Sequence, residues 1–147
     1  MLQRPQSVYL LAGAALLAVF VALGYVWEPG VTAAYPWLGP VTYALAVATA
    51  VVALVAVFQY KDRPRQRTTI GVAQLLDLAL LLPLLVGLFS TTPPAPEVPA
   101  VGGDDAFGLY GRYLVALVPI VAYALLRMAR RGVDRDIATV RSMDRIR

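Results

Sequence analysis

Apolar residues in this chain are gathered into four long blocks. The blocks lie at residues 8–27, 41–60, 70–90 and 109–126. Each is about 20 residues long, and a helix of that length covers roughly 30 Å, the thickness of the hydrocarbon core of a bilayer. Because a backbone in that layer must satisfy its own hydrogen bonds, each block is predicted to be a transmembrane helix. Pro83 and Pro119 fall inside two blocks, where a membrane helix tolerates them as kinks.

The composition supports a membrane protein. Of the 147 residues, 59% are hydrophobic and 15% are charged, whereas a soluble domain is about 45–50% apolar and about 25% charged. The length indicates a single domain over residues 1–147.

Two residue types are missing, and their absence excludes several kinds of chemistry. The chain has no cysteine and no histidine. Zinc–cysteine sites, iron–sulfur clusters, thiolate nucleophiles and catalytic triads with histidine are therefore excluded. The adjacent acids Asp104 and Asp105 provide too few oxygens for a calcium cage. We expect no cofactor, no metal site and no enzymatic activity.

The basic residues predict the orientation. Twelve of the thirteen lie before the first block, in the loop 61–69 or in the tail 127–147. The loops 28–40 and 91–108 carry only acidic charges. Because positive loops stay in the cytoplasm, both termini and the loop 61–69 are predicted to be cytoplasmic, and the other two loops to be external.

Asp77 is the polar residue placed at the greatest cost, because it lies about seven residues inside the third block, roughly 10 Å from its cytoplasmic end. Gln74 shares its helix face. Other polar residues of similar or shallower depth are Gln6, Ser7, Gln59, Tyr123 and Arg127. We predict an intramembrane polar cluster of Gln74, Asp77, Gln59 and Tyr123. It is either a hydrogen-bonded packing contact or a relay for protons, cations or a substrate.

The remaining candidates are arginines that contact lipid or a partner. Arg112 lies near the outer end of the fourth block, where it can reach the headgroups. The tail predicts a short amphipathic helix from about 134 to 144, near the membrane plane, with its apolar side toward lipid or the bundle. Its polar side and flanks carry Arg131, Arg135, Arg141 and Arg145. Anionic cytoplasmic lipids, a membrane-protein partner or a second copy are the expected contacts. Nucleic acid is not expected, because the tail has no aromatic residue to stack on bases.

Three segments resemble a known family. They are the opening Gln-Arg-x-Gln-Ser, the central YKDRPRQ and the closing Val-Arg-Ser-x-Asp-Arg-x-Arg. They are similar to the small four-span inner-membrane proteins of the Bacteroidota that carry the domain of unknown function forty-two ninety-three. The resemblance covers the whole chain, with Pro5 as a small departure. It implies the topology and the bacterial inner membrane, and it provides no catalytic residue.

The sequence therefore predicts an all-α integral membrane protein. Its fold is a four-transmembrane-helix bundle with both termini in the cytoplasm and a short amphipathic C-terminal helix. We expect a non-catalytic accessory, assembly or scaffold protein of the inner membrane. The alternative is a small transporter or channel that uses Asp77.

Overall fold

A computed structural model describes residues 5–23, 33–90 and 105–144 of the chain. Within these residues the structure is helical and contains no strand. The helices are α1 (Pro5–Leu23), α3 (Leu38–Phe58), α4 (Arg63–Ser90) and α5 (Asp105–Asp144). Each predicted block therefore lies mainly on a helix, although residues 59–60 of the second block lie in the turn after α3 and residues 24–27 of the first block lie outside the described part.

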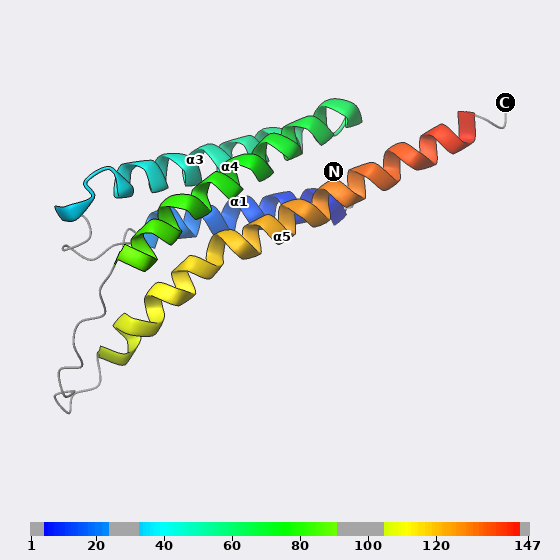
Figure 1. Cartoon of the computed structure of the whole chain (residues 1–147). Coiled ribbons are helices and arrows are strands. Elements are labelled where there is room, and N and C mark those ends of the chain that lie inside the picture. Colours follow the sequence, from blue (N-terminus) through cyan, green and yellow to red (C-terminus); the bar gives the residue numbers. More distant parts are fainter. Residues whose placement is uncertain (1–4, 24–32, 91–104, 145–147) are drawn as a thin grey trace.

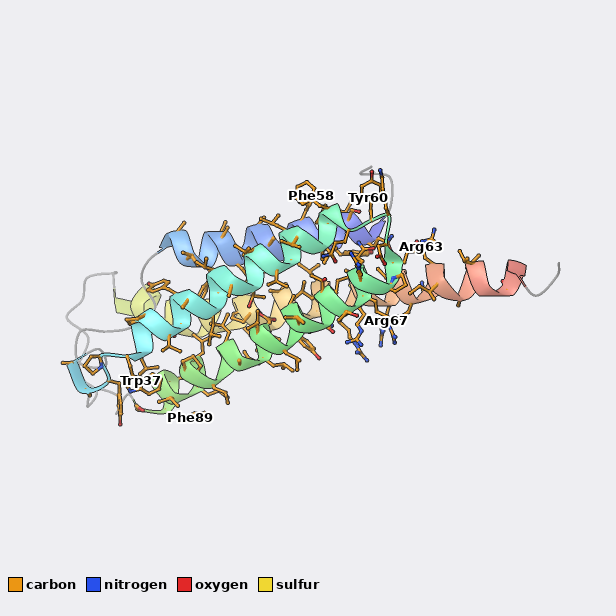
Figure 2. The ribbon with its side chains drawn as sticks, turned by 90° about the horizontal axis from the view of Figure 1, so that it is seen from above. Trp37, Phe58, Tyr60, Arg63, Arg67 and Phe89 are labelled. Atoms are coloured by element: carbon orange, nitrogen blue, oxygen red, sulfur yellow. The ribbon has the colours of Figure 1, made fainter. Side chains whose placement is uncertain are left out.

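The helices pack side by side, and neighbours along the chain run in opposite directions (Figure 1). The main contacts join α1 to α3 and α5, and α4 to α3 and α5. The start of α1 and the α3–α4 turn therefore lie at the same end of the molecule. Figure 2 shows Phe58, Tyr60, Arg63 and Arg67 near this end, and Trp37 and Phe89 at the other. We call the end that holds Arg63 and Arg67 the polar end.

The interior is built from small and polar side chains as well as leucines. Alanines are buried on every described helix, for example Ala14, Ala53, Ala73 and Ala129. Large apolar side chains instead cover the outer surface, and Phe58 and Phe89 are about 79% and 82% exposed. Small residues at helix contacts let backbones approach closely, which is typical of helices that pack in lipid.

Length and composition qualify two of the described helices as candidate membrane spans, α3 and α4. The apolar stretch of α1, Gln6–Ala22, is shorter. Only 28% and 39% of the two span windows are buried, so neither helix is enclosed as the core helix of a soluble protein would be. The structure thus gives a helical protein with two candidate spans.

The connection between α3 and α4 is shorter than the predicted loop 61–69. Residues 63–69 are helical, because α4 begins at Arg63. Asp62 caps this start: its Oδ1 accepts a hydrogen bond from the Arg65 backbone N–H at 3.1 Å. Such a cap satisfies one of the free N–H groups at a helix start. The hydropathy pattern predicted where the apolar stretch begins, at residue 70, whereas the helix itself begins at Arg63.

The prediction of a separate C-terminal helix is wrong. Residues 105–144 form one helix of 40 residues, and its last part projects beyond the other helices along the same line (Figure 1). The described part of the tail therefore continues α5 and does not form a second helix. Gly132 does not break α5. A side chain there would meet the Cβ of Gln6 at 3.2 Å, so this glycine lets the start of α1 approach α5.

Candidate functional site: the polar end of the helices

Polar contacts at this end join α5 to α1 and α4. The side-chain amide of Gln6 on α1 donates to Oδ2 of Asp136 at 3.3 Å. From α4, Arg63 Nη1 donates to the backbone carbonyl of Asp136 at 3.2 Å. Arg67 Nε lies 2.6 Å from Oδ1 of Asp134. These contacts join α1 and α4 to the residues of α5 just after Gly132. This part of α5 therefore holds the helices together at the polar end.

A second set of contacts closes the turn between α3 and α4. Gln66 is fully buried, and its Nε2 donates to the carbonyl of Ala56 at 3.0 Å. That carbonyl is near the end of α3 and also accepts the backbone N–H of Gln59 at 3.3 Å. The hydroxyl of Thr69 donates to Gln59 Oε1 at 2.6 Å. Gln59 therefore contacts α4 at Thr69, about two helical turns before Asp77.

Gln74 is oriented by an arginine that crosses from α5. Arg130 Nη1 donates to Gln74 Oε1 at 3.0 Å. An arginine can only donate hydrogen bonds, so this contact fixes which end of the amide is oxygen. Gln74 is buried, and its Nε2 has no hydrogen-bond partner among the described residues. Arg130 reaches across Gly71, where a Cβ would lie 3.5 Å from its Nη1.

Asp77 lies on the same buried face of α4, and its side chain is 1% exposed. It points into the helical packing, as the sequence predicts. The expected polar contact is not found: within the described part of the chain, neither carboxyl oxygen has a hydrogen-bond partner. Burying a polar group without a partner is costly. In native proteins such groups are rare enough to require a reason.

An open groove of about 440 Å³ runs between α4 and α5 from the polar end inward. Tyr123 and Gln74 both line it, so two members of the predicted cluster do lie at one cavity. Asp77 is not among the lining residues. The predicted cluster is therefore divided among the α3–α4 turn (Gln59), the groove (Gln74 and Tyr123) and the interior (Asp77).

The predicted lipid-contact arginines are described only in part. Arg131 and Arg135 are exposed and line a smaller cavity of about 220 Å³ beside Gln6. Arg112, Arg141 and Arg145 have side chains outside the described residues. Within the described part, no group of three potential ligands could hold a metal ion.

Sequence reasoning missed Arg130, Gln66 and the aspartates of α5. Gln66 lies two turns before Gln74 on one helix face, and this spacing was a usable signal. Arg130 lies three residues after Arg127, on the same side of α5. Its contact with Gln74 depends on how far α4 and α5 are shifted along each other, which the sequence does not give.

The fold and this end together define a class: an all-helical protein with two candidate spans, an apolar exterior and a polar end rich in arginine. Residues 31–146 match the family described as Domain of unknown function (DUF4293). The chain belongs to this family, which confirms the family that its sequence resembles, although the opening segment at residues 3–7 lies outside the matched range. It has no match among curated proteins or solved structures.

Proposed function

We propose that this protein is embedded in the bacterial inner membrane by four helices and acts there as a non-catalytic accessory or scaffold protein. The observation that carries the proposal is the outward position of large apolar side chains on helices α1, α3, α4 and α5. A monomeric soluble protein rarely exposes a continuous apolar patch of more than a few hundred Å². Lipid, or the apolar helices of a partner, is the environment that such a surface requires.

The distribution of charge supports an orientation with the polar end in the cytoplasm. Arg63, Arg65 and Arg67 begin α4. Arg130 and Arg131 lie on the part of α5 that contacts Gln74 of α4 and Gln6 of α1. Positive residues are retained on the cytoplasmic side of inner-membrane proteins. Because α1 begins and α5 ends toward this end, both termini belong on the cytoplasmic side in this proposal.

The contacts at the polar end favour a structural role over catalysis. Gln6, Gln66, Arg67 and Asp134 are used to tie helices together. Asp77 is the single acid within the described parts of the apolar blocks. Intramembrane proteolysis by paired carboxylates needs two acids, and metal-assisted hydrolysis needs more ligands than one.

The scaffold role is tested on the intact protein in its native membrane. We expect alkaline carbonate to leave it in the membrane, and mild detergent to release a complex larger than one chain that contains one reproducible membrane-protein partner. Cross-links should place that partner on the apolar outer faces. Release by carbonate would contradict membrane embedding. A monomer without cross-links would contradict the scaffold role alone.

The absence of a hydrogen-bond partner for Asp77 among the described residues favours a second candidate, a small transporter or channel. In this case the carboxyl would carry a proton or a cation, as intramembrane acids do in pumps. Purified protein in vesicles with an entrapped pH-sensitive dye should then pass protons, and Asp77→Asn should abolish the flux without loss of fold. Equal flux in both proteins would reject this candidate.

A further inference from the structure

The groove between α4 and α5 changes character along its length. Near the polar end it is lined by Arg67 and Arg130, and Arg127 follows one turn further inward. Beyond them its α4 side is formed by Leu75 and Leu78. Leu75 is about 68% exposed, so the apolar part of the groove opens onto the outer surface of the helices. The same groove therefore has a basic part, at the polar end, and an apolar part that an acyl chain could contact.

The charge in the groove is not balanced within the described residues. Arg67 is paired with Asp134. Arg127 and Arg130 have no carboxylate partner in the described part of the chain, and Arg130 is held by the neutral side chain of Gln74. Gln74 is itself buried and retains an unused amide donor. Two guanidinium groups that line the same groove therefore carry positive charge that no carboxylate balances within the described residues.

We infer that this groove binds one anionic phospholipid. The phosphate lies between Arg127 and Arg130, and one acyl chain follows Leu75 and Leu78. Guanidinium groups bind phosphate oxygens through paired hydrogen bonds. Basic pockets between helices on the cytoplasmic side are a known way to hold acidic headgroups. A free phosphate would use the arginines but leave the apolar half of the groove empty. The inference rests on the membrane embedding proposed above.

The test uses the full chain in mild non-ionic detergent and native mass spectrometry with defined lipids. We expect phosphatidylglycerol to bind in a one-to-one complex and phosphatidylcholine to bind at least about tenfold more weakly, because each basic residue near an acidic headgroup contributes severalfold to affinity. Arg127→Gln combined with Arg130→Gln should remove this preference. Arg127→Gln alone should weaken it, and this variant breaks no contact seen in the described residues.

Lys61→Gln combined with Arg65→Gln is the matched control, because it removes the same charge from the polar end at two exposed residues that do not line the groove. It should keep the preference for phosphatidylglycerol. Equal losses in the two double variants would mean general surface attraction and would overturn the inference. Displacement of the lipid by millimolar inorganic phosphate would also overturn it, since the groove would then recognise phosphate alone. Carbonate extraction of the wild-type protein reports separately whether the membrane embedding itself fails.

Discussion

The carboxyl of Asp77 is buried, and none of the described residues provides a hydrogen-bond partner for it. Its depth on α4 was predictable, because the apolar residues around it fix where it lies in the third block. Its missing partner was not predictable, since hydrogen bonds across helices depend on their relative height and rotation. The pairing of Gln74 with Arg130 shows the same limit.

We expect Asp77→Ala to raise the stability of the protein in detergent by about 1–3 kcal/mol, because it removes a buried polar group that has no partner. Leu80→Ala, one turn further along the same buried face, is the matched control and should lower stability by about 2–5 kcal/mol through the cavity it leaves. Thermal unfolding followed by circular dichroism measures both. A loss of stability in Asp77→Ala would mean that the carboxyl has a structural partner.

The structure gives Gly132 a packing role that the sequence did not predict. In the sequence it lies just before the predicted tail helix 134–144, whereas in the fold it gives room to Gln6. We expect Gly132→Leu to lower stability by about 1–3 kcal/mol through crowding. Gly39→Leu should have little effect, because nothing lies within 4 Å of a Cβ built there. Equal effects of the two changes, measured by thermal unfolding, would contradict the close approach of α1 and α5.

At the scale of elements, the hydropathy pattern located each block mainly on a helix, but it misplaced the start of α4 and the end of α5 by several residues. Hydropathy reports which residues suit hydrocarbon, and a helix continues past that layer wherever its backbone is satisfied. Asp62 caps α4 at residue 63, ahead of the apolar stretch. Beyond the fourth block, Val133 is buried and Ile137 packs against the core, so tertiary contacts hold the extension of α5.

The cap of α4 is tested by a pair of substitutions. Asp62→Ala removes the acceptor for the Arg65 N–H and should lower stability by about 0.5–2 kcal/mol. Asp62→Asn keeps a side-chain oxygen at the same place and should have little effect, because asparagine caps helices as well as aspartate. Chemical denaturation of the purified protein distinguishes them. An equal loss of stability in Asp62→Asn would mean that the negative charge of Asp62, and not its helix cap, stabilises the protein.

The continuity of α5 is tested by distance measurement. Spin labels on cysteines at Met128 and Ser142 should lie roughly 21 Å apart along a straight helix, at 1.5 Å per residue. Both side chains are exposed, so labelling should leave the packing intact. A tail that turned at Gly132 into the membrane plane would shorten the separation to roughly 16 Å, by the same rise per residue. Pulsed electron resonance resolves the two cases, and the shorter distance would restore the separate tail helix.

For the whole molecule, the placement of small, large and charged residues gives one consistent picture. Large apolar side chains lie outside, alanines and several polar groups lie inside, and arginines gather at one end. The all-helical fold and the location of the blocks followed from composition and pattern. The contacts within the polar end did not, because they join residues such as Gln6 and Asp136 that are distant in sequence. The orientation in the membrane remains a prediction from charge alone.

That orientation can be tested directly, because the chain has no cysteine and each introduced cysteine is a single reporter. In intact cells with a permeable outer membrane, cysteines at Thr91 and Ala100 should react with an impermeant maleimide. Cysteines at Thr68 and Thr139 should not. These last two side chains are exposed in the structure, so they should react fully once the membrane is dissolved in detergent. A lack of labelling at these two positions in intact cells would then mean that they face the cytoplasm and not that they are buried. If the cysteines at positions 68 and 139 were labelled in intact cells and those at 91 and 100 were not, the orientation of the protein would be the reverse of the one predicted. The polar end and its groove would then face away from the cytoplasm.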